Sequence, residues 1–236
     1  MPQAAARQAT GAAWEPVTPS GWLVEDTLSA RISPQLGLAA LVGALRAQRV
    51  EVRVGAADEV GAVVHATGVA GLADLSAYVG RTVGAGVKGQ ALALRHEARD
   101  LPQLFVDGLH IVPHVDGTVA IGSTSEPVWH EDAPDAQLDG LLTRAVAAVP
   151  VLAGAEVVAR WAGVRPRAAS RAPVLGEWPG RAGHYVANGG FKIGFGMAPK
   201  VAEVMADLVL DGRDAVPEAF SVVALLSKGV ARDGAL

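Results

Sequence analysis

The feature that most constrains this chain is a glycine run, Asn188-Gly-Gly-Phe-Lys-Ile-Gly-Phe-Gly-Met-Ala-Pro199. Glycine has no Cβ, so the main chain can turn tightly and its N–H groups can approach a large planar or anionic ligand closely. A strand is predicted just before the run, at Tyr185–Ala187. An amphipathic helix is predicted after it, from Ala198 to Leu210, closing at Asp211-Gly212. The run is therefore either a ligand-binding loop or a tight turn into a helix.

A second segment supplies a cation in a rigid setting. Trp161-Ala-Gly-Val-Arg-Pro166 places Arg165 between small residues and a proline. A rigid guanidinium suits a carboxylate, which it can hold with two parallel hydrogen bonds. Arg165 could equally pair with a structural carboxylate, and Lys192 could be an ordinary surface lysine. The prolines beside these segments make them rigid. This favours one site for a small carboxylate next to a bulky cofactor.

The pattern of apolar residues predicts an α/β (α+β) fold. Short strands with Asp-Gly turns between them indicate an antiparallel sheet in the middle of the chain. Helical spacing of apolar residues begins at Ser33-Pro34, with proline at the first helical position, and recurs after Pro134. The predicted strands are 50–54, 61–68, 90–94, 104–106, 110–113, 118–121, 157–161 and 185–187; the predicted helices start at 34, 134 and 198.

We expect three parts along the chain. Residues 1–20 are small, polar and proline-bearing, and are predicted to be a flexible N-terminal segment. Residues 21–75 and 157–236 are predicted to form one α/β domain. Residues 76–156 are predicted to form the antiparallel sheet domain inserted between them.

Composition excludes several classes of function. The chain has 236 residues, of which 50% are hydrophobic and 19% charged, and this is typical of a globular protein. The formal net charge of −4 disfavours a nucleic-acid partner. The sequence contains no stretch of eighteen uninterrupted apolar residues, so a membrane span is not predicted. The absence of cysteine excludes disulfides, thiolate nucleophiles and cysteine-bound metals, and a cytoplasmic location is the default expectation.

Other motifs favour simpler interpretations. Gly84-Ala-Gly-Val-Lys-Gly89 matches the dinucleotide fingerprint, but the alternating residues after it predict a strand where the fingerprint needs a helix. His110 and His114 are four residues apart on a predicted strand, so a surface or pocket-lining role is favoured over a metal site. Ser123 lacks the Gly-x-Ser-x-Gly context of a hydrolase nucleophile.

The order of motifs resembles the family of FAD-dependent D-amino-acid oxidases and glycine oxidases. The resemblance spans most of residues 21–212. Each piece is weak alone, and the collinear set is fairly specific. The matching pieces are Glu25-Asp26, the helix after Ser33-Pro34, Val63–Gly68, Val87–Gln90, His110–Gly117, Ala120–Glu126, Trp161–Pro166, Pro173–Gly176 and Asn188–Pro199.

The resemblance implies FAD as cofactor and oxidation of the C–N bond of a small amino acid or related amine, by hydride transfer to the flavin. Arg165 would hold the substrate carboxylate, with Lys192 near the substrate or the flavin. His110 and His114 would lie on the sheet that covers the substrate. The residues implied to contact the flavin are Val64, Ala66, Thr67, Gly68, Gly189, Gly190, Phe191, Lys192, Ile193, Gly194, Phe195, Gly196 and Met197. No catalytic side chain and no metal is implied.

One departure from the family limits these expectations. The family begins with a strand–Gly-x-Gly-x-x-Gly–helix unit that binds the ADP part of FAD, and no such segment is present in this sequence. We therefore expect an incomplete FAD-binding α/β domain that binds FAD weakly or not at all by itself. The chain would be a truncated form of an oxidase, or a partner chain would supply the missing unit. The alternative is a non-catalytic subunit or degenerate relative.

Overall fold

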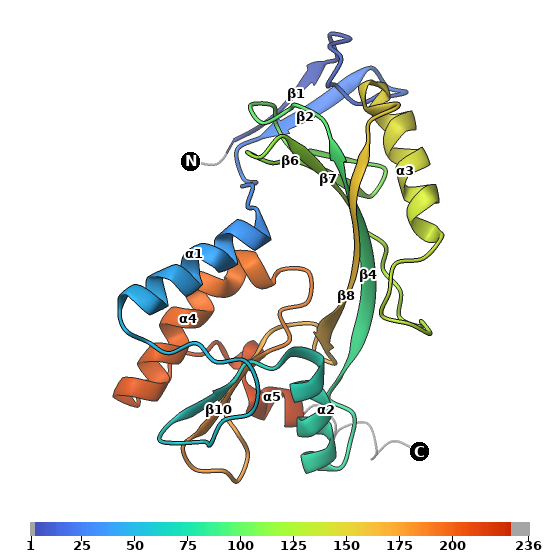
Figure 1. Cartoon of the computed structure of the whole chain (residues 1–236). Coiled ribbons are helices and arrows are strands. Elements are labelled where there is room, and N and C mark those ends of the chain that lie inside the picture. The colour runs from blue at the N-terminus through green and yellow to red at the C-terminus, as the bar shows by residue number, and fades with distance from the viewer. Residues whose placement is uncertain (1–2, 228–236) are drawn as a thin grey trace. The chain divides into compact units, whose positions relative to one another are not determined.

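The computed structural model describes residues 3–227, which divide into two compact units (Figure 1). Within the described residues, unit 1 comprises 3–56, 89–125 and 131–163, and unit 2 comprises 57–88, 126–130 and 164–227. Residues 21–56 group with the antiparallel sheet in this division, whereas the sequence-based domains place them with the α/β part.

The antiparallel sheet of the sequence prediction is confirmed. Its five strands lie in the order β5-β6-β7-β4-β8, with hairpins joining β5 to β6 and β6 to β7. Asp107 and Gly108 both have positive φ (50° and 72°), as a tight hairpin turn requires. The strands are β4 (Gly84–Arg95), β5 (Leu104–Val106), β6 (Leu109–Pro113), β7 (Thr118–Gly122) and β8 (Val157–Ala168).

One face of this sheet forms the core of unit 1. Leu92 and Leu94 alternate along β4 and are fully buried, as a strand with one covered face requires. They pack in one cluster with Leu138 and Leu141 of helix α3 (Gln137–Ala148), which a short turn of 3-10 helix, η1 (Pro150–Leu152), follows. The helix predicted after Pro134 is thus confirmed.

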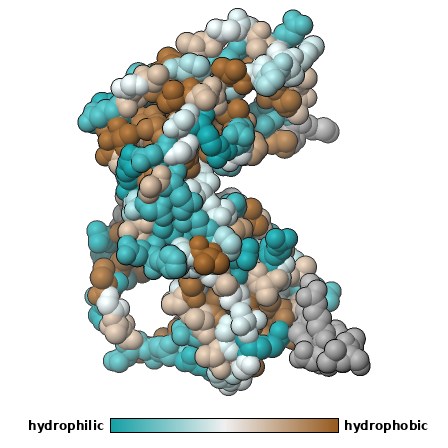
Figure 2. Space-filling model, turned by 90° about the vertical axis from the view of Figure 1, so that its right-hand side faces the viewer, coloured by the Kyte–Doolittle hydropathy of each residue, from teal (hydrophilic) through white to brown (hydrophobic). Residues whose placement is uncertain are grey.

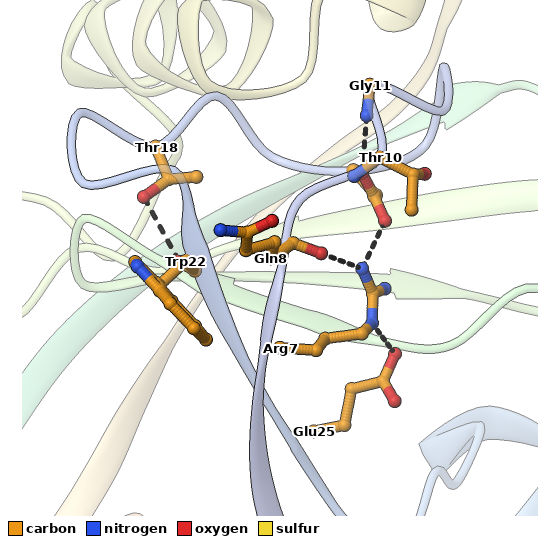
Figure 3. Close-up of polar contacts among 8 residues, drawn as sticks. Arg7, Gln8, Thr10, Gly11, Thr18, Trp22 and Glu25 are labelled. Carbon is orange, nitrogen blue, oxygen red and sulfur yellow. Dashed lines mark hydrogen bonds and ion pairs between the residues drawn. The ribbon is translucent and has the colours of Figure 1, made fainter.

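The N-terminal segment is more ordered than predicted. Strand β1 (Ala4–Gln8) pairs antiparallel with β2 (Trp22–Asp26), although residues 1–20 were expected to be flexible. Figure 3 shows Arg7 beside Glu25 of the paired strand, where Arg7 Nε donates to Glu25 Oε1 (2.6 Å). Arg7 Nη1 also donates to Glu15 Oε1 (2.5 Å). Strand β1 is stabilised by pairing with β2 and not by a local pattern of apolar residues.

Helix α1 (Pro34–Ala47) begins at a proline in the first position, as predicted. Every residue of α1 is at least partly exposed. The strand predicted at 50–54 is wrong. Those residues are irregular, and Val50, Val52 and Val54 are exposed, because alternating residues make a strand only where a neighbouring strand pairs with them.

Unit 2 is built on a three-stranded sheet in the order β3-β10-β9. Strand β3 (Val63–His65) runs parallel to β10 (His184–Asn188), and β10 runs antiparallel to β9 (Val174–Glu177). Helix α4 (Gly194–Asp211) starts four residues before the predicted position and ends at Gly212 in the left-handed conformation, as predicted.

Helices cover both faces of this sheet. Val186 packs with Leu75 of α2 (Gly68–Val79) and with α5 (Val222–Ser227). The neighbouring residues of β10 face the other way and pack, together with the short 3-10 helix η2 (Glu218–Phe220), against α4. A sheet between helices is the α/β layer that the sequence predicts.

Apolar residues also remain on the surface, and Figure 2 shows them as brown patches among hydrophilic ones on the face in view. No helix within residues 3–227 has the length and hydropathy to cross a bilayer.

Candidate functional site

The candidate site lies at one edge of the unit 2 sheet. Because β3 and β10 are parallel, their carboxyl ends meet at the same edge. The turn Ala66-Thr67-Gly68 leaves β3 and opens α2, while residues 189–193 leave β10 and open α4. In open α/β sheets, ligands bind outside the carboxyl ends of strands, where helix N-termini present free N–H groups.

A buried asparagine joins the two connections. Asn188 Nδ2 donates to the Gly68 carbonyl oxygen (2.8 Å), and Asn188 Oδ1 accepts from the Gly189 N–H (2.7 Å). The side chain thereby fixes the start of the glycine run against the turn after β3. Asn188 is not among the site residues predicted from the sequence. Its position at a strand end directly before Gly-Gly was the available signal.

The glycines of the run serve two different purposes. Gly189 has a φ of 74°, and a Cβ there would lie 3.2 Å from the Ala168 Cβ, so both backbone geometry and close packing require glycine. Gly194 and Gly196 instead face open space, where a Cβ would meet nothing within 4 Å. They lie in the first turn of α4, whose N–H groups lack intrahelical partners. A ligand can therefore approach the backbone here.

The Arg165 segment lies against the glycine run. The Phe191 N–H donates to the Pro166 carbonyl oxygen (3.2 Å), so the backbones of the two segments meet at the residue after Arg165. Arg165 is partly buried. This burial lowers the pKa of its guanidinium from the usual value, and the nearby Glu126 carboxylate opposes that shift. The guanidinium stays charged, because arginine does not lose its proton in proteins.

Further charged groups surround this point. Lys192 is exposed, with its Nζ 5.6 Å from the centre of the Phe191 ring, and the Arg167 guanidinium lies 5.9 Å from the same ring. Lys88 is buried, with its Nζ 3.7 Å from Glu126 Oε2, and the two residues also exchange backbone hydrogen bonds. Arg167 and the Lys88–Glu126 pair were not predicted, because only the fold brings them here.

The predicted flavin contacts are mostly accessible. Val64, Ile193 and Phe195 are 43%, 51% and 47% exposed, and Ala66 and Thr67 are exposed too. Gly68, Gly190, Phe191, Gly194 and Met197 are partly buried, whereas Gly189 is buried. Exposed apolar side chains beside free helix N-termini suit a bulky ligand with both apolar and anionic parts.

The two predicted histidines belong to unit 1. His110 is exposed on β6, with its ring 4.7 Å from the Phe105 ring. His114 lines a cavity of about 450 Å³ together with Arg31 and Arg99. Arg165 and Lys192 belong to unit 2. Each unit thus holds two of the four predicted substrate residues, and their common role stays a prediction.

The fingerprint-like Gly84–Gly89 segment lies in strand β4, as expected from its alternation. A Cβ on Gly84 would lie 2.8 Å from the Arg167 carbonyl oxygen, and a Cβ on Gly86 would lie 2.5 Å from Val164 Cγ1. Close packing against β8 accounts for these glycines.

Comparison with known proteins supports the resemblance. The model of the family described as FAD dependent oxidoreductase matches residues 9–208. A glycine oxidase of Geobacillus kaustophilus is 37% identical over 152 residues, which are 63% of this chain and 40% of that protein. A glycine oxidase of Pseudomonas putida is 34% identical over 125 residues, which are 52% of this chain and 34% of that protein. The matches thus span well under half of these relatives.

Solved structures show the same fold. The crystal structure of the Geobacillus kaustophilus glycine oxidase aligns with a TM-score of 0.61 at 28% identity, over 92% of this chain and 51% of that chain. An iminodiacetate oxidase from a Chelativorans species aligns with a TM-score of 0.78 at 20% identity, over 92% of this chain and 67% of that chain.

Proposed function

The chain belongs to the family of FAD-dependent oxidoreductases, and on this premise we propose that it oxidises the C–N bond of a small amino acid or related amine. The glycine oxidases among its relatives support an amino-acid substrate. The proposal rests on one observation. The Arg165 strand and the glycine run meet through the Phe191-to-Pro166 hydrogen bond, beside the edge where β3 and β10 end.

The residues at this edge fit part of FAD. The open space at Gly194 and Gly196 gives access to the N-terminus of α4, where N–H groups and the helix dipole favour an anionic or electron-rich ligand edge. Exposed Val64, Ile193 and Phe195 offer apolar contact to a ring system. When bound, FAD supplies the hydride acceptor. The residues of the chain hold and orient the ligand.

Arg165 is proposed to bind the substrate carboxylate. Its guanidinium keeps its charge and is partly desolvated, and both properties strengthen a charge-assisted hydrogen bond. Lys192 adds a second, exposed positive charge, with its Nζ 5.6 Å from the centre of the Phe191 ring. His110 and His114 are also proposed to contact the substrate. The proposed location of the protein is the cytoplasm.

A dinucleotide-binding unit from outside the described fold is proposed to complete the FAD site. The Gly-x-Gly-x-x-Gly segment of this chain lies within strand β4, so it does not form the strand–turn–helix unit that holds a pyrophosphate. Strand β3 is an edge strand of its sheet, which leaves its outer side available for pairing. We therefore propose that residues 1–236 bind FAD weakly by themselves, and that a partner chain is one source of the missing unit.

A non-catalytic subunit is the second candidate, and helix α1 favours it. Leu36, Leu38, Leu41 and Leu45 of α1 are each more than 40% exposed, an apolar load that suits contact with another protein surface. A subunit of this kind would keep the substrate-side fold without activity of its own.

Kinetics of an Arg165 variant test the proposal. In an active, FAD-loaded form, Arg165→Ala should raise KM for glycine or a related amino acid about 10- to 100-fold, because a hydrogen bond to a charged group contributes about 1.5–3 kcal/mol. Arg160→Ala is the matched control on the same strand, since Arg160 pairs with Asp139 on the surface. Unchanged KM in Arg165→Ala would remove the carboxylate role. Absence of oxidase activity with a saturating amino-acid panel in a form that has been shown to hold FAD would favour the non-catalytic subunit.

A further inference from the structure

Unit 2 contains a cluster of two imidazoles and a carboxylate outside the candidate site. His65 is the last residue of β3, His184 is the first residue of β10, and Glu59 lies in the irregular segment before β3. Parallel pairing places His184 opposite Val63 and His65 opposite Val186, so both histidines lie on the same face of the sheet. The turn Ala66-Thr67-Gly68, proposed to contact the flavin, begins only after His65.

The three ligand atoms are close together. His65 Nε2 lies 3.0 Å from His184 Nδ1 and 3.9 Å from Glu59 Oε1, and all three atoms lie within 4.8 Å of one another. Zinc bonds to nitrogen and oxygen are about 2.0–2.2 Å, so two ligands at a tetrahedral angle are about 3.4 Å apart. The distances of 3.0 and 3.9 Å from His65 Nε2 to the other two ligand atoms lie on either side of this value. We propose that Glu59, His65 and His184 form a zinc-binding site.

The atoms around the cluster orient its ligands. The His65 ring packs 4.9 Å from the ring of buried Trp178, and this contact limits how far the imidazole can rotate. Arg181 Nη2 donates to Glu59 Oε2 (2.9 Å), which leaves Oε1 directed at the histidines. Ligating carboxylates in metal sites commonly accept such a second hydrogen bond, and it fixes their orientation.

Zinc replaces one existing interaction at this site. Without metal, His65 Nε2 and His184 Nδ1 share one proton in a hydrogen bond, since one ring must donate and the other accept. In the zinc-bound state that proton leaves its position between the rings, because both nitrogens then donate lone pairs to the metal. Each neutral ring keeps one N–H, on His65 Nδ1 and on His184 Nε2, so the ring that held the shared proton changes tautomer. An N–H on His184 Nε2 faces the Arg181 donor 3.5 Å away, so that long contact opens.

Two histidines and one carboxylate leave a fourth position for water. Glu59 is 48% exposed at its side chain, so the ion can enter from solvent. The bound metal would fasten the irregular segment around Glu59 to the two parallel strands. The site is thus expected to be a local clamp on the sheet that positions the turn Ala66-Thr67-Gly68, and it does not depend on the proposed oxidase activity.

Calorimetric titration of the metal-stripped chain with Zn²⁺ tests the site, with circular dichroism to confirm folding. We expect one zinc per chain, and Mg²⁺ should not compete because it prefers oxygen ligands. Glu59→Gln and His184→Gln should each weaken zinc binding at least 10-fold, the lower end of what even outer-shell partners contribute. His110→Ala removes an exposed histidine of unit 1 and should bind zinc like the parent chain.

The result that overturns the proposal is equally defined. If the parent chain takes up no stoichiometric zinc, or if Glu59→Gln and His184→Gln both bind it with unchanged affinity, the cluster is not a zinc site. Glu59 is exposed in an irregular segment, so its variant is expected to fold even if His184→Gln does not.

Discussion

The hydrogen bonds of Asn188 predict a measurable loss of stability when its side chain is removed. Asn188→Ala leaves the buried Gly189 N–H without its acceptor 2.7 Å away and removes the hydrogen bond that the Gly68 carbonyl oxygen accepts at 2.8 Å. An unsatisfied buried polar group costs about 1–3 kcal/mol, and the Gly68 side of the pair is only partly buried. We expect the free energy of unfolding to fall by about 2–4 kcal/mol.

Urea unfolding followed by far-ultraviolet circular dichroism measures this change, and the melting temperature should fall by about 5–15 °C for a chain of this size. Lys200→Ala is the matched control, because Lys200 makes only a surface pair with Glu203 and should change stability by about 0.5 kcal/mol or less. An Asn188→Ala chain that unfolds within 0.5 kcal/mol of the parent would refute the reasoning, on the scale that separates surface changes from buried ones.

A charged variant sharpens the same test. Asn188→Asp keeps an acceptor for the Gly189 N–H but puts a carboxylate oxygen beside the Gly68 carbonyl oxygen. Burial and this contact raise the pKa of the introduced carboxyl in the folded state. Its deficit relative to the parent should therefore be largest at neutral pH and should shrink as pH falls, because the protonated acid can donate to the carbonyl. A deficit independent of pH would contradict the assigned donor.

Three further perturbations test the packing and the charges of each unit. Gly84→Ala should lower unfolding free energy by about 1–3 kcal/mol, since its Cβ would lie 2.8 Å from a backbone oxygen, whereas Gly43→Ala, with open space, should be neutral or stabilising. Leu92→Ala should cost about 2–5 kcal/mol by leaving a cavity in the unit 1 core. A hydrogen bond from Arg7, helped by the Thr10 and Gly11 N–H groups, lowers the pKa of Glu15 to about 2. The stabilisation that Glu15 contributes is therefore complete above about pH 4.5 and is lost as pH falls toward 2, and Glu15→Gln should reduce this acid dependence. Unfolding curves across pH and denaturant concentration measure all three effects. Equal stability changes in Gly84→Ala and Gly43→Ala would contradict the packing argument, and a cost under about 1 kcal/mol in Leu92→Ala would contradict the cavity argument. An acid profile of Glu15→Gln that matches the parent would contradict the role of the Glu15 carboxylate.

Local sequence patterns predicted a strand correctly where the alternating segment also has a neighbouring strand to pair with. The Asp107-Gly108 turn is such a case, because the residues that tolerate positive φ lie between two alternating apolar segments. Val50–Val54 has the same alternation but no pairing strand, and it is irregular. The converse holds at β1, where Ala-Ala-Ala-Arg-Gln has no alternating apolar pattern and forms a strand because β2 pairs with it.

The candidate site divides in the same way. Arg165 and the glycine run could be identified from their own residue types, since proline restricts the local backbone and glycine permits conformations that other residues avoid. The roles of Asn188, Arg167 and the Lys88–Glu126 pair could not be identified in this way, because these residues contact partners that are far away along the chain. The same is true of Glu59, His65 and His184, which are spread over more than a hundred residues.

By itself, the sequence determined the alternation of the antiparallel sheet, the helix that follows the glycine run and the family to which the chain belongs. These features follow from interactions between residues close together, or from motifs whose order along the chain is itself informative. Only the tertiary structure decided that β3 lies parallel to β10, and hence that Asn188 reaches Gly68 and His184 reaches His65. Such contacts depend on strand pairing between distant segments, which no local pattern encodes.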